Sequence, residues 1–167
     1  MPHTRISNLS TKWPVPPFQV VLVEPEIPPN TGTIARLCAA TGTRLHLVGP
    51  LGFRLTDAAV RRAGLDYWES VDLVRHRDYA AFAADAAGGT CYYFSTGGGR
   101  SYLDPSYHPG DYLVFGNESH GLPDDLLRAH PEQILGIPIM SDHVRSLNLA
   151  NAVSIALYEA LRQVSRR

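Results

Sequence analysis

Lysine is nearly absent from this chain. Of its 15 lysine and arginine residues only Lys12 is a lysine, and it lies close to the N-terminus. The rest of the chain therefore has no P-loop lysine, no lysine that forms a Schiff base and no lysine general base. These absences exclude P-loop nucleotide hydrolysis and chemistry that depends on a lysine amine.

The chain has few cysteines, and its histidines show no metal-binding spacing. Cys38 and Cys91 are the only cysteines and form no CxxC pair, so no disulfide framework is expected. Both lie in apolar stretches, which favours buried and unreactive thiols. The seven histidines show neither HxxxH nor HExxH spacing, so we expect no metal site.

The chain carries no strong net charge and no long apolar run. Its net charge is −1 and its isoelectric point about 6.6, whereas domains that bind nucleic acid over a wide surface are usually basic. A local basic patch is compatible with these values. No apolar run approaches the roughly 20 residues of a membrane-spanning helix. We therefore expect no membrane partner and no DNA partner.

The 167 residues are enough for one domain with a substantial core. A chain of this length buries roughly 70% of the surface that it exposes when unfolded. Residues 1–17, MPHTRISNLSTKWPVPP, lack the apolar region of a secretory signal and end in a proline-rich stop. We expect residues 1–17 to form a flexible tail, residues 18–167 to form a single domain, and the protein to be cytoplasmic.

Short apolar runs alternate with helical patterns after the tail. Strands are predicted over Phe18–Val23, Arg44–Gly49, Ser70–Val74, Thr90–Ser95, Asp111–Gly116 and Ile134–Ile139. Helices are predicted over 30–40, 56–64, 78–89, 122–130 and 146–166. In the first helix, Asn30 or Thr31 is the expected cap and Gly42 the expected stop. This alternation is typical of an α/β fold with a mainly parallel sheet flanked by helices.

The last helix has the clearest pattern. Seven apolar residues recur at spacings of three and four and form one stripe: Leu149, Val153, Ala156, Leu157, Ala160, Leu161 and Val164. Each large aliphatic side chain gains about 1.5–3 kcal/mol when it is buried. We expect this stripe to leave too much apolar surface for one small domain, and therefore predict a homodimer.

Four loops follow predicted strands of this sheet. In parallel sheets, ligands bind beyond the carboxyl ends of the strands. The loops read EPEIPPNTG, STGGGRS, GNESHGLP and IPIMSDHVRSLN, and three of them are rich in glycine, asparagine and serine. Their convergence predicts a binding site at this edge of the sheet.

Some of these loop residues also have ordinary structural explanations. In FGNESHGLP, Gly116 and Gly121 allow the backbone to approach a ligand, or they simply shape a strand-to-helix loop. Ser119 beside His120 suggests a hydrolase nucleophile and base, but the GxSxG pattern is absent. STGGGRS, residues 95–101, matches neither nucleotide-binding glycine pattern, which favours a loop over a site or a plain surface loop.

The start of the last helix and position 36 on the first helix hold further candidate site residues. Ser146 can cap this helix, with Leu147 and Asn148 in its first turn. Asn148 and Asn151 are weak helix formers, which indicates a requirement other than helix stability. Arg36 points away from the apolar stripe of its own helix, so it is either solvated or functional.

Together these segments resemble the SPOUT class of RNA methyltransferases. NTGTIAR, LVFGNESHGLP and IPIMSDHVRSLNLANAVSIALYEA are similar to the three motifs of that class, in the same order. EPEIPPNTGTIARLCAATGTRLHLVGPLGF, RRAGLDYWE and GDYLVFGNESHGLP resemble more closely the bacterial tRNA (cytidine/uridine-34 2′-O)-methyltransferases. The likeness covers about residues 20–163. That family usually has proline at the position of Asn117 and arginine at that of His120.

The resemblance implies an α/β fold with a C-terminal trefoil knot, a homodimer and bound S-adenosylmethionine. It implies methyl transfer to the ribose 2′-hydroxyl of the wobble nucleotide, position 34, in the anticodon loop of a tRNA. The implied cofactor-binding residues are Phe94, Gly116, Glu118, Ile137, Ser146, Leu147 and Asn148. Asn30 and Arg36 would be catalytic, with Arg36 supplied by the partner subunit as a proton acceptor or as a clamp on the adjoining phosphate.

Three other functions stay open at this point. The departures at Asn117 and His120 are compatible with a 2′-O-methyltransferase for another tRNA or rRNA position. A non-catalytic RNA-binding module would keep the loops, and a flavodoxin-like protein would bind a flavin or nucleotide there.

Phosphate contacts and base stacking on the RNA are expected from Arg44, Arg54, Arg61, Arg62, Tyr67 and Trp68.

Overall fold

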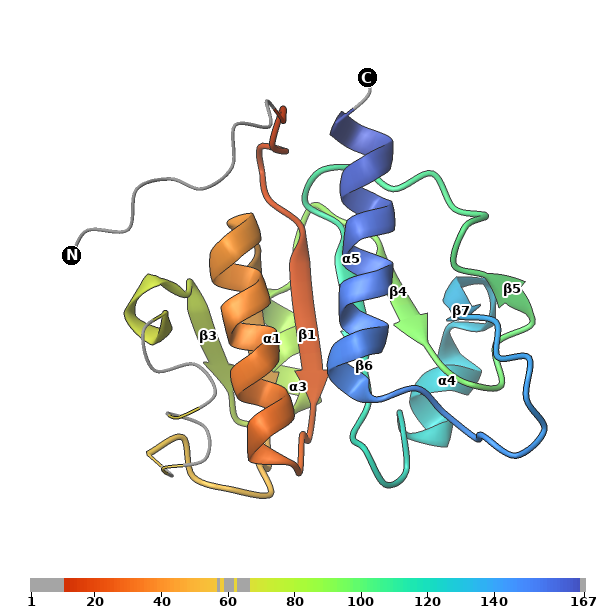
Figure 1. The fold of residues 1–167 in the computed structure, drawn as a ribbon, viewed down its shortest axis with the longest axis horizontal. Helices are drawn as coiled ribbons and strands as arrows, with labels where there is room; N and C mark the ends of the chain where they lie inside the picture. Colours follow the sequence, from red (N-terminus) through yellow and green to blue (C-terminus); the bar gives the residue numbers. More distant parts are fainter. Residues whose placement is uncertain (1–10, 57, 59–61, 63–66, 166–167) are drawn as a thin grey trace.

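The structure, a computed structural model, describes residues 11–56, 58, 62 and 67–165. Within these residues seven parallel strands form one sheet in the order β3-β2-β1-β6-β4-β7-β5, with helices on both faces (Figure 1). The strands are β1 (Gln19–Val23), β2 (Arg44–Val48), β3 (Leu73–His76), β4 (Cys91–Phe94), β5 (Arg100–Ser101), β6 (Tyr112–Phe115) and β7 (Ile134–Gly136). The helices are α1 (Pro28–Thr41), α3 (Tyr79–Asp85), α4 (Asp124–Ala129) and α5 (Leu149–Ser165), with short 3₁₀ turns η1 (Trp68–Ser70) and η2 (Pro131–Gln133). The predicted α/β fold with a parallel sheet is confirmed.

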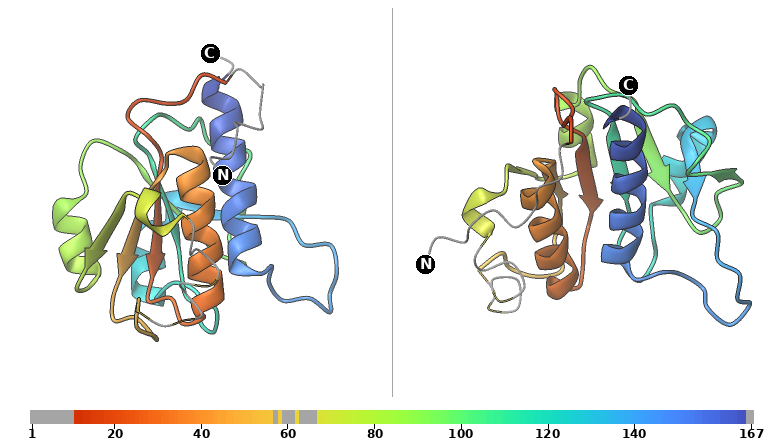
Figure 2. Two further views of the ribbon diagram at one scale, coloured as in Figure 1. Left: turned by 60° about the vertical axis from the view of Figure 1, so that its left-hand side comes forward. Right: turned by 45° about the horizontal axis from the view of Figure 1, so that its top comes forward.

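Alternation along the strands divides the core between the two faces of the sheet. In the central strand β1, Val20 and Leu22 point into the core beneath α1 and α5, whereas Val21 and Val23 point into the core beneath α3 and α4. Figure 2 shows these two helix pairs on opposite faces of the sheet. Because both faces are covered, β1 reads as an unbroken apolar run rather than as an alternating one.

The apolar stripe of α5 is buried within this chain. Val153, Ala156, Leu157 and Ala160 are fully buried, and α5 packs beside α1 over β6 (Figure 1). The expectation that this stripe needs a second subunit is therefore wrong, because the sheet and α1 cover it. The homodimer itself stays a prediction.

Helix α1 begins earlier than predicted and has no capping side chain of its own. Pro28 and Pro29 take its first two positions, and Ile27 occupies the cap position. Prolines fit there because an N–H group at these positions would have no partner inside the helix. At the other end Gly42 adopts a φ of 65° and ends the helix as predicted, with its N–H bonded to the Cys38 carbonyl.

Two strands differ from prediction at their ends. β7 stops at Gly136 rather than at Ile139, because Pro138 has no N–H group to donate to the ladder. β3 begins at Leu73, later than expected, because residues 68–70 form η1 and the strand pairs in register with β2. A proline in one case and pairing with a neighbouring strand in the other therefore set strand ends that the apolar pattern places differently.

The helix predicted over 78–89 is shorter than expected. Asp78 caps it, and its carboxylate accepts a hydrogen bond from an N–H of the first turn at 2.9 Å. The helix ends at Asp85, and a backbone N–H just beyond it bonds to a tyrosine hydroxyl of β6. Most of the helix predicted over 56–64, and residues 1–10 of the expected tail, lie outside the described residues.

Two buried histidines form a hydrogen-bonded chain beside α3. His46 Nδ1 on β2 lies 2.9 Å from His76 Nε2 on β3, and His46 Nε2 lies 2.8 Å from Gln19 Oε1. The Gln19 oxygen can only accept, so His46 Nε2 carries a hydrogen and its Nδ1 accepts one from His76. Burial, together with the nearby His76 and Arg44, lowers the pKa of His46 to about 4.

This lowered pKa predicts that acid destabilises the fold. Between pH 6.5 and about pH 4 the unfolded chain holds a proton on His46 that the folded chain does not, so the free energy of unfolding falls as the pH falls through this window. The loss is on the order of 3 kcal/mol, at about 1.4 kcal/mol for each pH unit. Urea unfolding at several pH values checks this: His46→Gln should show a flatter pH dependence than the parent, and parallel curves would contradict the assignment.

Candidate functional site

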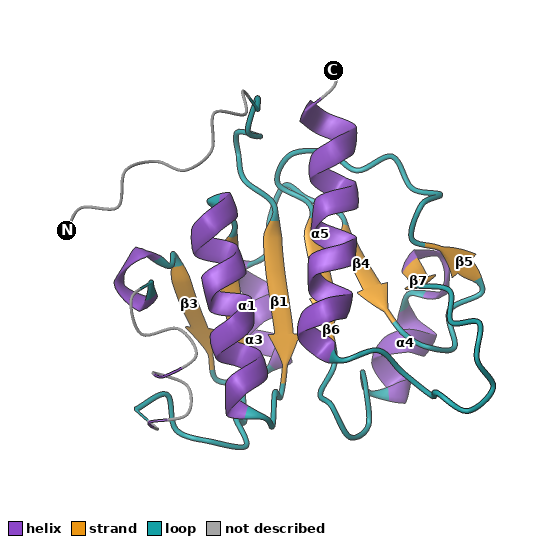
Figure 3. Cartoon of the chain, in the orientation of Figure 1, coloured by secondary structure: helices purple, strands orange, loops and turns teal. Residues whose placement is uncertain are grey.

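A cavity of about 640 Å³ opens at the carboxyl ends of the central strands. Its walls come from the four loops whose sequences predict a binding site, and Figure 3 shows loops gathered at that end of the sheet. The rings of Phe94 and Phe115 stack in the cavity wall, with centroids 4.6 Å apart and planes 12° from parallel. These two residues are register partners on β4 and β6, which places both rings on the same face.

Eight of the nine predicted site residues line this cavity. They are Asn30, Phe94, Gly116, Glu118, Ile137, Ser146, Leu147 and Asn148. The ninth, Arg36, is not among its lining residues. The fold therefore brings together the implied cofactor-binding residues from three segments and Asn30 from a fourth.

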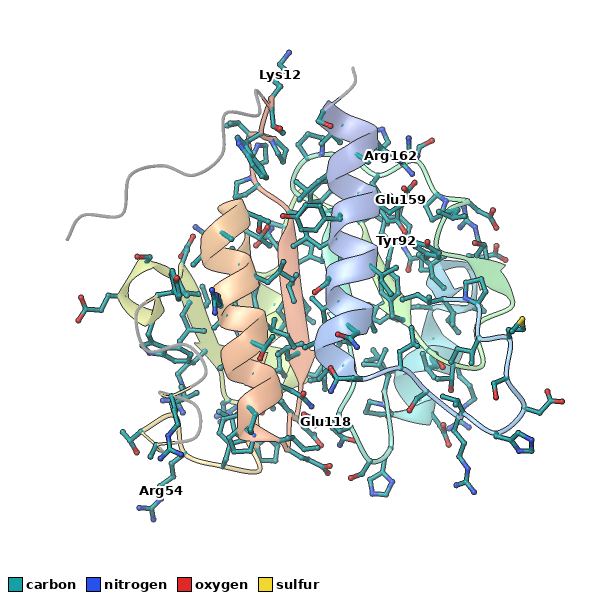
Figure 4. All side chains as sticks on the ribbon, viewed as in Figure 1. Lys12, Arg54, Tyr92, Glu118, Glu159 and Arg162 are labelled. Atoms are coloured by element: carbon teal, nitrogen blue, oxygen red, sulfur yellow. The ribbon has the colours of Figure 1, made fainter. Side chains whose placement is uncertain are left out.

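Glu118 holds the loop that precedes α1. Its carboxylate accepts hydrogen bonds from the N–H groups of Glu26 and Ile27, at 2.8 and 3.1 Å, and from the Asn30 side chain at 3.2 Å. The Ile27 N–H belongs to the cap position of α1, so Glu118 caps this helix from 91 residues away. The predicted capping by Asn30 or Thr31 is therefore wrong. Figure 4 shows Glu118 beside the start of α1.

The same loop begins with an unusual backbone conformation at Glu24. Its φ of 52° lies in the left-handed region, which costs a residue with a side chain about 1 kcal/mol. Its N–H donates to the Val48 carbonyl at 2.7 Å, so the chain leaves β1 in a sharp turn next to β2. The turn leads into the two N–H groups that Glu118 binds, and those hydrogen bonds offset its cost.

Asn30 links the segments that carry the three predicted motifs. Its Nδ2 donates to Glu118, and its Oδ1 accepts a hydrogen bond from Asn148 Nδ2 at 3.0 Å. Asn148 in turn caps α5, because its Oδ1 accepts from the N–H groups two and three residues later, at 2.9 and 3.3 Å. The predicted capping of α5 by Ser146 is therefore wrong, and helix capping accounts for Asn148. One hydrogen-bonded chain thus ties three walls of the cavity together.

The loop between β6 and α4 is a tight turn. The Asn117 carbonyl accepts from the Gly121 N–H at 3.0 Å, and the Asn117 side-chain oxygen accepts from the His120 N–H at 2.7 Å. A Cβ on Gly116 would lie 2.0 Å from the Gly121 carbonyl carbon, and Gly121 itself has a φ of 69°. Both glycines are therefore required by the turn itself.

Ser119 and His120 do not form the pair of a hydrolase. The Ser119 hydroxyl donates to the Glu26 carboxylate in the loop before α1. His120 is exposed and lines the cavity without a hydrogen bond from Ser119 among the described residues. Without that contact the serine has no base to activate it.

Arg36 is exposed on α1, away from the cavity. Its guanidinium carbon lies 4.8 Å from the centre of the Tyr67 ring, which is a cation–π contact. The prediction that Arg36 points away from the apolar stripe of α1 is confirmed, since Ile34 and Cys38 on that stripe are buried. Its catalytic role stays a prediction.

The residues expected to contact RNA differ in how exposed they are. Arg44 pairs with Asp72 at 2.7 Å, with both side chains about half exposed. Such an exposed ion pair contributes at most about 1 kcal/mol, so it leaves Arg44 able to meet a phosphate. Trp68 is half-buried and packs against the main core, and Arg61 lies outside the described residues.

Several residues of the cavity wall were not predicted from the sequence. They include Phe115, Asp124, Leu135 and Arg145. Phe115 can be found from strand register, because it pairs with Phe94. Asp124 lies in the first turn of α4, where acids commonly favour the helix dipole, so no sequence signal distinguishes it.

Neither cysteine has the reactive character that catalysis would need. Cys38 is buried, and burial raises the pKa of its thiol to about 12, so it stays protonated. Cys91 is half-buried, and burial raises the pKa of its thiol as well. Among the residues that the structure describes, no group of three or more histidine, cysteine and acidic side chains could hold a metal ion.

A model of the SpoU rRNA Methylase family matches residues 17–158. That range contains all eight predicted residues that line the cavity. The chain belongs to the SpoU rRNA Methylase family. The resemblance drawn from the three motifs is thereby confirmed.

Members and neighbours of the SpoU family match this chain over most of its length. The tRNA (cytidine(34)-2′-O)-methyltransferase of Burkholderia ambifaria is 50% identical over 149 residues, which are 87% of this chain and 95% of that protein. A structure described as giving insights into the 2-OH methylation of C/U34 on tRNA has a TM-score of 0.86 and 47% identity, covering 90% of this chain and 97% of that one. An AdoMet-bound rRNA methyltransferase from Sinorhizobium meliloti has a TM-score of 0.78 and 29% identity, covering 88% of this chain and 56% of that one.

Proposed function

We propose that this protein transfers a methyl group from S-adenosylmethionine to the ribose 2′-hydroxyl of nucleotide 34, a cytidine or modified uridine, in a tRNA anticodon loop. The observation that carries this proposal is the 50% identity, over 149 residues, with a relative named for that reaction. The cavity supports it, because its walls are the segments that carry the three motifs. The reaction also accords with a site that offers neither a paired nucleophile nor a cluster of metal ligands among its described residues.

The cavity fits S-adenosylmethionine in size and in chemistry. Its volume of about 640 Å³ lies within the range of ~300–1,000 Å³ that is typical of small-molecule sites. Phe94, Ile137 and Leu147 provide apolar walls, and Ser146 and Asn148 provide polar groups. Bound there, S-adenosylmethionine supplies a methyl group that its sulfonium sulfur activates.

The chain's own residues act mainly by positioning. Transfer of a methyl group to a hydroxyl is an in-line displacement, so holding the ribose in line supplies much of the rate. The hydrogen-bonded chain of Glu118, Asn30 and Asn148 fixes three loops relative to one another and thereby fixes the shape of the cavity. We assign Glu118 and Asn30 to this positioning.

Arg36 is assigned to the cavity of the partner subunit. A guanidinium group is protonated at every ordinary pH, so Arg36 is better suited to bind the phosphate next to the acceptor ribose than to accept a proton. Its position supports this assignment, because it is exposed and its side chain is held against Tyr67, away from its own cavity.

A homodimer is the assembly that this assignment requires. Ile155 and Tyr158 on the outer side of α5 are 38% and 54% exposed, and their spacing of three places them on one face. We expect sedimentation velocity at micromolar concentration to show a dimer, and the double variant Ile155→Asp, Tyr158→Asp to be a folded, inactive monomer. A parent protein that sediments as a stable and active monomer would refute the dimer.

The C-terminal trefoil knot is part of the same proposal. β7 lies between β4 and β5, and residues 137–148 leave this end of the sheet in a long loop before α5 returns across it (Figure 1). We propose that this segment threads through the loop that follows β4. The position of the third motif in the cavity wall, beside the first two, supports this route.

A tRNA substrate supports a cytoplasmic location, which is part of this proposal. DNA is not a substrate, since it lacks the 2′-hydroxyl that accepts the methyl group. No helix in the described ranges has the length and apolar character of a membrane span.

A binding measurement and a transfer measurement separate this function from its rivals. Calorimetry should show that the protein binds S-adenosylmethionine, and labelled cofactor should transfer its methyl group to bulk unmodified tRNA. A non-catalytic RNA-binding module would bind tRNA but not the cofactor. A flavodoxin-like protein would bind a flavin or nucleotide in place of S-adenosylmethionine.

A further inference from the structure

A second, smaller cavity of about 380 Å³ adjoins the first beside β5 and β7. Thr96, Ile137, Ile139 and Arg145 line both cavities, so the two are neighbours that share one wall. The second cavity lies where the glycine-rich loop after β4 meets the segment before α5. The proposed methyl transfer gives it no role.

This second cavity carries positive charge without an acid to balance it. Among the residues that line it, the charged ones are Arg100, at the start of β5, and Arg145, shortly before α5. Arg100 Nη1 donates to the Glu132 carbonyl at 3.0 Å, which helps to fix the direction of its guanidinium group. Arg145 makes no hydrogen bond or ion pair with any residue in the described part of the chain. Two arginines therefore line this cavity, and none of its lining residues is acidic.

The glycine-rich loop does not provide this site through its own backbone. The N–H groups of Gly97 and Gly98 already donate to Ser95, at 3.3 and 3.1 Å. A Cβ on Gly98 would lie 2.6 Å from the Leu135 carbonyl carbon, so glycine is what lets the loop press against β7. The loop thereby brings Arg100 beside β7, and the amides of Gly97 and Gly98 are not available to a ligand.

We propose that Arg100 and Arg145 bind a phosphate of the substrate RNA, next to the nucleotide that enters the first cavity. This inference rests on the proposed function. Guanidinium groups present N–H donors whose geometry matches phosphate oxygens. Ser101 and Ser141 add hydroxyl groups to the same cavity. The net charge of the chain is −1, and this arginine pair, in a cavity without an acidic lining residue, is the local patch that positions the RNA backbone.

The salt dependence of tRNA binding tests the proposal. The probe is an unmodified full-length tRNA transcript, and its affinity is measured at several salt concentrations for the parent, Arg100→Gln, Arg145→Gln and the double variant. Each lost phosphate contact should lower the slope of log affinity against log salt by about 1 and weaken binding by about tenfold at low salt. Arg145→Lys keeps the charge and should retain most of the slope.

Arg75→Gln is the matched control, because Arg75 is an exposed arginine on β3, at the opposite edge of the sheet. It should leave the salt slope unchanged. Arg100→Gln should bind S-adenosylmethionine like the parent, since Arg100 does not line the first cavity. If the parent binds tRNA and the double variant keeps the parental slope, this inference is overturned while the proposed function stands. If the parent binds no tRNA, the proposed function fails and the inference fails with it.

Discussion

Replacing Arg36 with alanine is expected to lower the rate constant of methyl transfer by about two to three orders of magnitude, because the phosphate next to the acceptor ribose loses the donor that positions it. The affinity for S-adenosylmethionine should not change, because Arg36 is assigned to the phosphate next to the acceptor ribose and not to the cofactor. The free energy of unfolding should change by less than about 1 kcal/mol, the scale of an exposed cation–π contact. Single-turnover kinetics and calorimetry measure these effects, with Arg75→Ala as the control. Activity close to that of the parent would rule out a catalytic role.

Mixed dimers then show which subunit Arg36 serves. The partner variant is Asn148→Ala, which lacks a group that lines the cavity and caps α5. If Arg36 crosses to the other subunit, a mixed dimer of the two inactive variants contains one complete site. Random exchange of equal amounts should then restore about a quarter of the parental activity, since half of the dimers are mixed and each has one site of two. No recovery would mean that Arg36 does not cross.

The second large effect is expected from Glu118→Ala. This change leaves two N–H groups, of Glu26 and Ile27, and the Asn30 amide without their acceptor. A hydrogen bond to a charged group contributes about 1.5–3 kcal/mol where water is excluded and less where water can reach it. The three hydrogen bonds to Glu118 are part-buried or exposed. We therefore expect their joint loss to lower the free energy of unfolding by about 3 kcal/mol. The value of kcat/KM should fall by about a hundredfold, because the loops that shape the cavity are no longer fixed.

Urea unfolding and initial-rate kinetics of three variants check this prediction. Glu118→Gln keeps one acceptor oxygen and should lie between the parent and Glu118→Ala. Glu69→Ala removes an exposed acid from η1 and should change neither quantity. Equal stability of Glu118→Ala and Glu69→Ala would show that Glu118 does not hold the start of α1.

Most of the sheet could be predicted from the sequence because its central strands are covered on both faces. Residues 20–23 in β1 and 112–115 in β6 are continuous apolar runs, and all of them are buried. β5 could not be predicted, since Arg100 and Ser101 form a polar edge strand whose pairing with β7 leaves no apolar pattern. The apolar pattern therefore identifies strands that are buried, and it misses a polar edge strand such as β5 that is defined by its pairing with β7.

The caps of the helices could not be predicted because they depend on contacts that are distant in the sequence. A local pattern favours the nearest hydroxyl or amide, which is why it selects Asn30 or Thr31 for α1 and Ser146 for α5. The structure uses Glu118 for α1, from 91 residues away, and Asn148 for α5. Asn30 could be recognised as a site residue, but its contact with Asn148 spans 118 residues and appears only in the fold.

The position of the site could be predicted, whereas its surroundings could not. The rule that ligands lie beyond the carboxyl ends of parallel strands selects the four loops that line the cavity. The period of α5 predicts a buried stripe, but it does not say whether the same chain or a second subunit covers it. Here α1 and the sheet cover the stripe. On α5, the exposed Ile155 and Tyr158, whose spacing places them off that stripe, are the residues offered to a second subunit in the proposed dimer.

Mapping the methylated nucleotide tests the proposed function most directly. The parent protein is incubated with isotope-labelled S-adenosylmethionine and unmodified tRNA, and nuclease fragments of the tRNA are analysed by mass spectrometry. We predict one labelled methyl group, on the ribose of nucleotide 34, and far less label after the same time in the reaction with Arg36→Ala. A methyl group on a base, at another tRNA position or only on ribosomal RNA would contradict the wobble assignment, and the absence of label from every RNA would contradict methyl transfer itself.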